Sequence, residues 1–269
     1  MGHFRGYLSV RPVGLASALS LYRCYAGAAV MRVAQPCKFV TVGQYLARPI
    51  VVESQGLRYR LRPRSEDLAY ILPTHKPMVQ AWFRPEPRQT VVDIGASIGQ
   101  FSLKAAKAGS KVVAVEANPT TAEALRFNCQ MNDLLGVEIR QVAVGASHGT
   151  ATLHSGAFSG VSSLRADWDP KNQNFSPTRY RVETVTLDEL CQPLAKPIDW
   201  LLIDVEGSEL GVLRGGRETL RRTKTVIIEA SAGETQPACQ ELLASAGLAT
   251  AEKVAQGQST DYWLMVRSA

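Results

Sequence analysis

The chain has 269 residues, of which 45% are hydrophobic and 20% are charged, so it suits one large α/β domain and excludes a fibrous or disordered protein. Its formal net charge is +6, yet the first acidic residue is Glu53, and six basic residues precede it. Without those six, 24 of the 30 basic residues remain to balance 24 acidic ones. This distribution speaks against a nucleic-acid groove on the main body.

The first 52 residues form an acid-free arm that carries arginines, serines and the apolar stretch VGLASALSLYRCYAGAAVM. Three interpretations stay open: helices that cap the main domain or its acceptor side, a surface in peripheral contact with an anionic membrane, or a transit peptide. The stretch does not predict a membrane span, because Arg23 and Tyr25 interrupt it before the roughly 20 apolar residues that a span needs.

The five cysteines are widely spaced and include no CxxC pair. This pattern predicts free thiols in a reducing compartment rather than a disulfide framework or a metal site. We therefore expect a cytoplasmic protein, with peripheral membrane attachment through the arm as the alternative.

A short cap region is predicted between the arm and the main domain. Residues 50–61 alternate between apolar and polar types around the turn sequence SQG, which predicts a hairpin. Four prolines at positions 73 to 87 break any long helix and indicate a linker. We predict an N-terminal arm and cap over residues 1–87 and a main domain over residues 88–269.

The main domain alternates short apolar runs with helical stretches. Strands are expected at 90–94, 111–115, 137–144, 200–205, 225–229 and 262–266, and helices at 101–108, 121–131, 209–221 and 237–246. Apolar strands separated by helices indicate a parallel sheet that is covered on both faces. The predicted fold class is a doubly wound, Rossmann-like α/β domain.

Residues 149–197 interrupt this alternation. The segments TATLHSG and YRVETVTLDEL predict an added strand pair around a stretch rich in Ser, Asn, Pro and Gly. Long loops inside compact domains are commonly lids or binding loops. We therefore expect an inserted acceptor lid here.

The stretch VVDIGASIGQF contains the end of the first strand of the main domain, with Asp93, and then the loop residues Gly95 and Gly99. A dinucleotide fingerprint would have a glycine where this chain has Ser97, and a carboxylate at the strand end would repel phosphate oxygens. Asp93 would instead attract an ammonium or sulfonium cation. Glu116, at the end of the next strand, can accept hydrogen bonds from a ribose diol. These features favour S-adenosylmethionine over a dinucleotide.

A second group of acids follows later strands. Asp204 and Glu206 come directly after the run WLLI, and Glu229 ends the run TVIIE. Such carboxylates could orient a hydroxyl acceptor, remove its proton, or hold a metal ion, although no metal-ligand spacing stands out. His154, in the predicted lid, is a further candidate base. Asn118 and Pro119 have the simpler interpretation of a helix start.

The motifs VVDIGASIGQFSL, VVAVEANP, QVAVG, VETVTLDEL and LLIDVEGSELGVLRGG, in this order, resemble the FkbM family of S-adenosylmethionine-dependent methyltransferases. The resemblance covers about residues 90–230 and implies a seven-stranded methyltransferase sheet. It also implies site residues, with Asp204 and Glu206 near methyl transfer and the segment from Gln141 to Ala143 near the adenine. The predicted cofactor site comprises Asp93, Gly95, Ala96, Ser97, Gly99, Glu116, Ala117, Asn118, Val142, Ala143 and Asp204.

Two positions depart from the family pattern. This chain has Ser97 where the family usually has Asn, and Leu202 where the family usually has Lys, two residues before Asp204. The second departure removes the cation that the family places beside Asp204.

We therefore predict an O-methyltransferase that acts on a hydroxyl of a sugar, glycolipid or secondary metabolite, so its partner is a small-molecule or glycan acceptor. The alternatives are a methyltransferase for RNA or protein, a nucleoside-binding protein without activity, and a nucleotide-dependent oxidoreductase. The balanced charge after residue 52 speaks against the RNA alternative.

Overall fold

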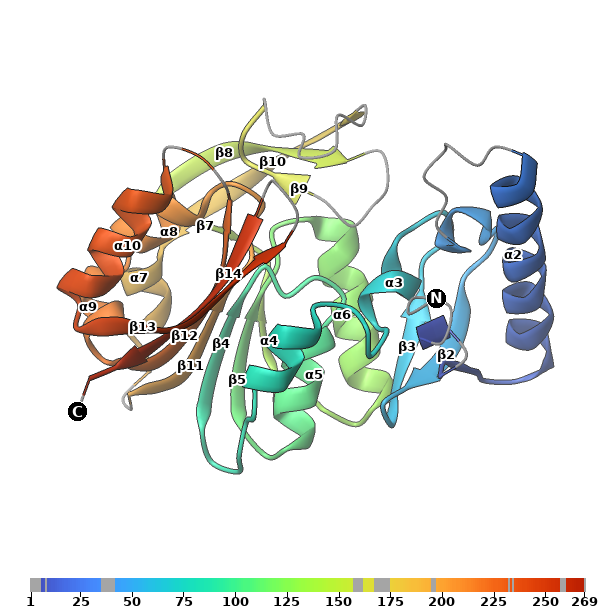
Figure 1. The fold of residues 1–269 in the computed structure, drawn as a ribbon, viewed down its shortest axis with the longest axis horizontal. Helices are drawn as coiled ribbons and strands as arrows, with labels where there is room; N and C mark the ends of the chain where they lie inside the picture. Colours follow the sequence, from blue (N-terminus) through green and yellow to red (C-terminus); the bar gives the residue numbers. More distant parts are fainter. Residues whose placement is uncertain are drawn as a thin grey trace.

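The computed structural model describes residues 6–7, 9–34, 42–156, 162–166, 175–194, 197–231, 233, 235–256 and 260–268. The described chain contains three sheets. A three-stranded N-terminal sheet lies at one end of the molecule, and a four-stranded sheet lies above the large seven-stranded one in the view of Figure 1.

The seven-stranded sheet has the order β13-β14-β12-β11-β4-β5-β6. The central strands run parallel, whereas β14 is antiparallel to β12, and β13 is antiparallel to β14. Every residue of β4 is buried, as expected for a strand between two helical layers. This confirms the predicted α/β class. The strands are β4 (Thr90–Ile94), β5 (Lys111–Val115), β6 (Glu138–Arg140), β11 (Ile198–Ile203), β12 (Thr223–Ser231), β13 (Leu248–Gln256) and β14 (Thr260–Arg267).

Two strands differ from the sequence prediction. Residues 137–144 do not form one strand, because β6 joins the central sheet while β7 (Ala143–Gly145) joins the four-stranded one. The apolar pattern also did not predict β13, since most of its side chains are exposed at the edge of the sheet.

Helices cover both faces of the central sheet. Alternate strand residues point to opposite sides, so Val91 packs in one hydrophobic cluster with Leu103 and Leu125, and Val92 packs in another with Val212 and Leu243. The first face is covered by α5 (Gln100–Lys107) and α6 (Pro119–Met131), with α4 (Pro77–Trp82) beside them; the second is covered by α7 (Leu187–Cys191), α8 (Glu209–Arg214), α9 (Arg217–Arg221) and α10 (Thr235–Ser245).

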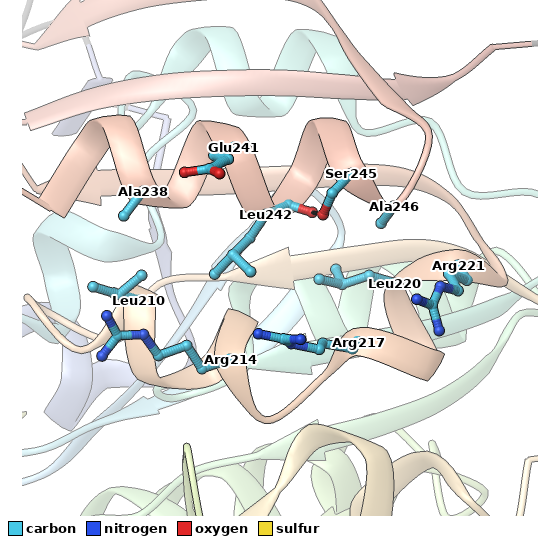
Figure 2. Close-up of a pocket in the computed structure, with 10 residues that line it drawn as sticks. All are labelled: Leu210, Arg214, Arg217, Leu220, Arg221, Ala238, Glu241, Leu242, Ser245 and Ala246. Atoms are coloured by element: carbon cyan, nitrogen blue, oxygen red, sulfur yellow. Dashed lines mark hydrogen bonds between the residues drawn. The ribbon is translucent and has the colours of Figure 1, made fainter.

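The single helix predicted over residues 209–221 is interrupted at Gly215. A Cβ atom at this position would lie 2.2 Å from the carbonyl oxygen of Gly145, so the chain passes too close to β7 for any side chain. The shorter helices α8 and α9 leave a groove of about 440 Å³ against α10, with Arg214 and Arg217 along its side (Figure 2). None of the predicted site residues lines this groove.

The inserted segment forms the four-stranded sheet, in the order β7-β10-β8-β9. β8 (Gly149–Gly156) and β10 (Phe175–Thr186) are antiparallel, which confirms the predicted strand pair. β9 (Ser162–Ser163) pairs antiparallel with the other edge of β8. Ser162 Oγ accepts a hydrogen bond from Asn118 (3.0 Å), and Ser163 Oγ donates one to the Glu206 carbonyl (2.6 Å). β9 therefore lies over the loops that follow β5 and β11. Residues 157–161, 167–174 and 195–196 of the predicted lid fall outside the described residues.

The N-terminal region forms a sheet with one long helix. Its hairpin confirms the prediction for residues 50–61, and its elements are β1 (Arg11–Pro12), α2 (Leu15–Ala34), η1 (Val42–Tyr45), β2 (Ile50–Ser54), β3 (Leu57–Leu61) and α3 (Asp67–Tyr70). One hydrophobic cluster includes Leu61, Phe83, Val91 and Leu103, and so extends across the predicted boundary at Arg88. Among the described residues, no helix is both long and apolar enough to cross a membrane.

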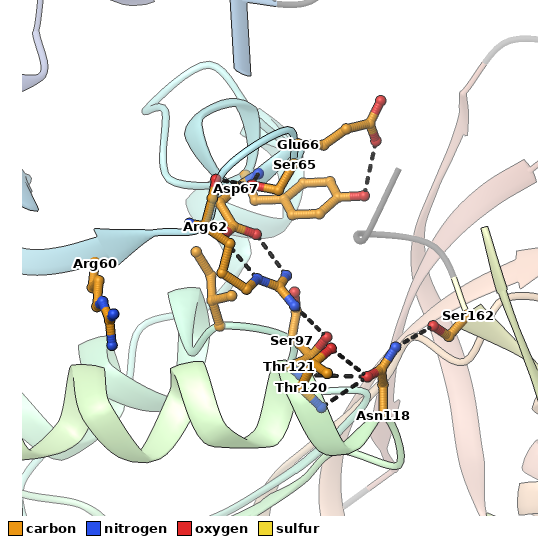
Figure 3. A network of polar contacts seen from close by, with 12 residues as sticks. Arg60, Arg62, Ser65, Glu66, Asp67, Ser97, Asn118, Thr120, Thr121 and Ser162 are labelled. Carbon is orange, nitrogen blue, oxygen red and sulfur yellow. Dashed lines mark hydrogen bonds and ion pairs between the residues drawn. The ribbon is translucent and has the colours of Figure 1, made fainter. Parts of the chain in front are cut away.

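Arg62 forms a buried ion pair with Asp67 inside the N-terminal region and also bonds to the start of α6. Arg62 donates to both carboxylate oxygens of Asp67, at 2.7 and 3.0 Å, and to Thr121 Oγ1 at 2.7 Å (Figure 3). The side chain of Asp67 has no exposed surface, and the bidentate geometry satisfies both of its oxygens. The end of β3 is thereby held against the first turn of α6.

Asn128 of α6 and Asn132, the residue that caps the end of α6, form hydrogen bonds with the free edge of β3. Asn132 accepts from the Arg58 amide (2.8 Å) and donates to the Arg58 carbonyl (2.7 Å), as a neighbouring strand would. Asn128, one turn earlier, accepts from the Arg60 amide (2.8 Å) and donates to the Ile98 carbonyl (3.0 Å). Asn128 thus connects the N-terminal sheet directly to the glycine loop.

Replacement of Asn128 by Ala should lower the free energy of unfolding by about 2 to 4 kcal/mol, because it leaves the buried Ile98 carbonyl and the part-buried Arg60 amide without partners. Asn132→Ala is the matched control, since its contacts with Arg58 are exposed to water, and it should cost less than about 1 kcal/mol. Urea denaturation of both variants measures the difference. Equal losses would show that Asn128 is not a structural link.

Candidate functional site

The glycine loop between β4 and α5 lies against the end of β11. Gly95 has φ +87°, and a Cβ atom there would be 1.9 Å from the Asp204 carbonyl oxygen. The amides of Gly95 and Ala96 both donate to the Val115 carbonyl at 2.9 Å, and the Asp204 amide donates to Ile94. The fold itself therefore requires Gly95, and the loop brings together the carboxyl ends of β4, β5 and β11.

The second glycine is also required by the fold. Gly99 has φ +100°, and a Cβ atom there would be 2.2 Å from Leu103 Cδ1. Ser97, between the two glycines, adopts the left-handed conformation at φ +50°. Asn tolerates this conformation better than other non-glycine residues, which explains the usual family residue at this position.

Glu116 organises the polar side of the glycine loop. Its two carboxylate oxygens accept the Ser97 amide (2.9 Å) and the Asn118 amide (2.8 Å). Burial raises the pKa of Glu116 to about 7, although these hydrogen bonds and the Arg62 charge oppose the shift. Because each carboxylate oxygen has a second lone pair, Glu116 can still accept hydrogen bonds from a ligand diol.

Asn118 has the structural role of a helix cap. Its Oδ1 accepts hydrogen bonds from Thr120 and Thr121 at the start of α6, and its Nδ2 donates to Ser162 (Figure 3). Its side-chain groups are therefore engaged within the protein. Ala117 packs against the small hydrophobic cluster of Ala143, Leu153 and Val182.

The segment predicted to lie near the adenine connects β6 to β7. Ala143 is buried, Val142 packs under the helices of the second face, and Gln141 is exposed and accepts hydrogen bonds from Arg126. Ala143 and Ala117 share a cluster, so the loops after β5 and β6 meet there.

Asp93 lies in the sheet with only 3% of its surface exposed. Ser102 Oγ donates to its Oδ2 at 2.6 Å. Burial raises the pKa of Asp93 to about 6, although the hydrogen bond from Ser102 opposes the shift. A cation bound beside Asp93 would lower that pKa again.

Lys76 brings a positive charge to the ends of β11 and β12. It lies at the N-cap of α4 in the left-handed conformation, and its ammonium contacts both Asp204 and Glu229. The Tyr262 ring lies beside it, with 5.4 Å between Nζ and the ring centre. Leu202, which stands where the family usually has Lys, is buried in the hydrophobic cluster. The cation that position 202 lacks is thus supplied by the cap region.

The two carboxyl groups on Lys76 differ in protonation. Burial opposes the ionisation of Asp204, but the charge and hydrogen bond of Lys76 hold the pKa of Asp204 below its usual value. Burial raises the pKa of Glu229, which Lys76 offsets only in part, and the charges of Asp204 and Glu206 raise it further. Lys76 therefore favours the ionised form of Asp204, whereas Glu229 binds a proton more readily than an ordinary glutamate does.

Glu206 lies in a turn rather than in an extended strand. β11 ends at Ile203, and Glu206 has φ +50°, so the alternation that would align Asp204 with Glu206 ends before it. Its negative charge still raises the pKa values of Glu229 and Tyr70. Glu209, buried at the start of α8, accepts hydrogen bonds from Gly207 and Ser231 and so orders this turn.

Two histidines bear on this site: His75, next to Lys76 in the chain, and the predicted base His154. The charge of His75 lowers the pKa of Asp204, after the larger effects of burial and Lys76. His154 lies on β8, opposite Arg179 and Ser163 in the four-stranded sheet. No pattern in the cap sequence PTHKPM indicated His75 or Lys76, since neither follows a strand of the main sheet.

Several buried polar atoms around the glycine loop have no protein partner. They include Ser97 Oγ, Gln100 Nε2 and Asp204 Oδ1. Buried polar groups are rarely left unpaired, so these atoms fit a ligand with its own donors and acceptors. Together with the acids Asp93 and Glu116, they suit a cationic adenosyl cofactor. Among the described residues, no group of His, Cys, Asp and Glu is arranged to hold a metal ion.

Two solved structures are similar to part of this chain at low identity. Magnesium protoporphyrin IX methyltransferase (ChlM) from Synechocystis, with bound SAM, is 13% identical with a TM-score of 0.41, over 68% of this chain and 71% of that chain. Fibrillarin from Aeropyrum pernix, in complex with S-adenosyl-L-methionine, is 11% identical with a TM-score of 0.43, over 68% of this chain and 67% of that chain.

Comparisons of sequence identify the family. 2-O-methyltransferase NoeI from Sinorhizobium fredii is 27% identical over 207 residues, which cover 71% of this chain and 82% of NoeI. Methyltransferase sdnD from Sordaria araneosa is 31% identical over 168 residues, which cover 52% of this chain and 65% of sdnD. The model of the methyltransferase FkbM domain matches residues 93–247, from the glycine loop to the end of α10. The chain therefore belongs to the FkbM family of S-adenosylmethionine-dependent methyltransferases.

Proposed function

We propose that this enzyme transfers the methyl group of S-adenosylmethionine to a hydroxyl of a sugar, glycolipid or secondary metabolite. The observation that supports this most is Asp204, which Lys76 keeps ionised and whose Oδ1 has no protein partner. An ionised carboxylate with a free oxygen suits an acceptor that must be oriented and deprotonated. NoeI, named as a 2-O-methyltransferase, is a relative with this kind of acceptor group.

When bound, S-adenosylmethionine supplies an electrophilic methyl group on a positively charged sulfur, and the sulfur keeps the bonding electron pair when the methyl group leaves. Asp204 Oδ1 would accept a hydrogen bond from the acceptor hydroxyl, hold its oxygen in place and take up its proton during transfer. Lys76 maintains the carboxylate in its ionised form beforehand, and the protonated Glu229 adds no competing negative charge.

The cofactor groups would be held by the glycine loop and the acids beside it. Asp93 attracts the ammonium group, and Glu116 accepts hydrogen bonds from the ribose hydroxyls. The loop of Gly95, Ala96, Ser97 and Gly99 would line the methionine end of the ligand.

The affinity for S-adenosylhomocysteine should rise about tenfold between about pH 5.5 and about pH 7.5, because the ligand favours the ionised forms of Asp93 and Glu116. Their pKa values of about 6 and about 7 place both ionisations in this interval. Isothermal titration calorimetry measures the affinity, and Glu116→Gln should weaken it and reduce its pH dependence. Glu123→Gln, exposed on α6, is the control. An affinity that is constant or falls over this range would contradict these roles.

Replacement of Asp204 by Asn should reduce methyl transfer by about 10² to 10⁴-fold, since the amide cannot accept the hydroxyl proton. The assay follows methyl label from the cofactor into acceptors of a cell extract, and identification of the labelled product names the acceptor. Asp133→Asn, an exposed residue whose left-handed conformation Asn tolerates, is the control. Unchanged transfer in Asp204→Asn, with unchanged binding of S-adenosylhomocysteine, would remove Asp204 from the mechanism.

Replacement of Lys76 by Ala should destabilise the protein by about 3 to 5 kcal/mol near pH 8, because it leaves Asp204 and Glu229 without their cation. Without Lys76 the pKa values of both carboxyls lie above those of the unfolded chain. The folded variant then binds more protons than the unfolded one, and its stability falls as the pH rises from about 4 to about 8.

The free energy of unfolding of wild type and variant, measured by urea denaturation across this pH range, tests the effect. The difference should widen with rising pH. Lys224→Ala, which removes an exposed ion pair with Asp199, is the control and should cost less than about 1 kcal/mol. A difference for Lys76→Ala that does not depend on pH would show that the three charges do not interact as described.

A further inference from the structure

The outer face of α2 exposes large apolar side chains at regular intervals. Leu15 is 77% exposed, Leu19 51%, Tyr22 63%, Val30 65% and Val33 85%. On a helical projection of about 100° per residue, these five side chains fall within a sector of about 80°. They form one continuous stripe, which we call the α2 stripe.

The contacts of α2 with the rest of the described chain use its opposite face. Ser17, Leu21, Cys24 and Ala28 are buried there, and Ser17 Oγ accepts a hydrogen bond from the Val51 amide (3.2 Å). These positions lie about half a turn away from the α2 stripe. The helix is therefore already anchored to the N-terminal sheet, and the stripe is additional apolar surface. Stripes of exposed large apolar residues mark interaction sites.

The charge around the α2 stripe is positive. Arg23 lies about 20° beyond one edge of the stripe, whereas Arg32 lies about 80° beyond the other edge. Both are exposed, and Arg11 is exposed on the adjoining β1. No acidic residue occurs before Glu53. An apolar stripe with an arginine at one edge and a tyrosine on it suits a helix that lies in the interface of a bilayer.

We propose that the α2 stripe binds the surface of a bilayer that contains anionic lipids. The helix would lie parallel to the bilayer, with its apolar side chains among the acyl chains and its arginines at the lipid phosphates. A second copy of this chain is a poorer occupant, because a symmetric pair of α2 helices would bring arginines together without an acidic partner. α2 lies at the end of the molecule remote from the central sheet (Figure 1), so binding would leave the carboxyl ends of the strands accessible.

Flotation of the full chain with vesicles tests the proposal. We expect binding to phosphatidylcholine vesicles that contain about 30 mol% phosphatidylglycerol, and much weaker binding to phosphatidylcholine alone or at high salt. The triple variant Leu15→Gln, Leu19→Gln, Val33→Gln should bind at least about tenfold more weakly. Leu135→Gln, which changes an equally exposed leucine outside the N-terminal region, should bind as wild type does.

The arginines are tested separately. Arg23→Gln should weaken binding by about fivefold, whereas Arg217→Gln, at the groove of Figure 2, should not. Circular dichroism and binding of S-adenosylhomocysteine confirm that each variant is folded.

Two results would overturn the proposal. One is wild-type binding that is absent, or that is unchanged in the folded triple variant. The other is a dimer of the wild type in light scattering, without vesicles, that the triple variant converts to a monomer, because the stripe would then be a contact between copies of this chain.

Discussion

The candidate site depends on one ammonium group between two carboxyl groups. Asp204 directly follows β11 and Glu229 lies in the neighbouring parallel strand β12, one residue past the Ile203–Ile228 pair, so the fold places the two acids side by side. In a partly buried position two such acids repel each other unless a cation lies between them. Lys76 supplies that cation from a segment that precedes the sheet, at the N-cap of α4.

Through Lys76, the N-terminal region contributes a side chain to the candidate site. Arg62 and Asp67 fasten the end of β3 to α6, and Asn128 connects β3 to the glycine loop. The same Arg62 lowers the pKa of Glu116, against the effect of burial. The cap region therefore also changes the pKa values of two acids at the glycine loop, that of Glu116 through Arg62 and that of Asp204 through Lys76. Around that loop the acids Asp93, Glu116 and Asp204 outnumber the bases, which suits a cationic cofactor.

The sequence indicates where the strand-end acids lie, but not the residues that contact them. Asp93, Glu116 and Asp204 each follow an apolar run, and parallel strands bring such positions together. Lys76 is 128 residues from Asp204 and 153 from Glu229, and its neighbours in the sequence resemble a linker. A contact across that distance leaves no periodic pattern to read. The sequence indicates His154 as a candidate base because His154 lies in the lid. The charge of His75, next to Lys76, lowers the pKa of Asp204. The sequence does not predict the edge strand β13, because most of its side chains are exposed and the strand therefore lacks an apolar pattern.

A crystal structure of the enzyme with S-adenosylhomocysteine would test the arrangement most directly. We expect the ribose hydroxyls on Glu116, the sulfur facing Asp204 across the glycine loop, and Lys76 still between Asp204 and Glu229. A ligand bound elsewhere, for example in the groove beside α10, or a Lys76 side chain that has left both carboxyl groups, would contradict the central role assigned to this ion bridge.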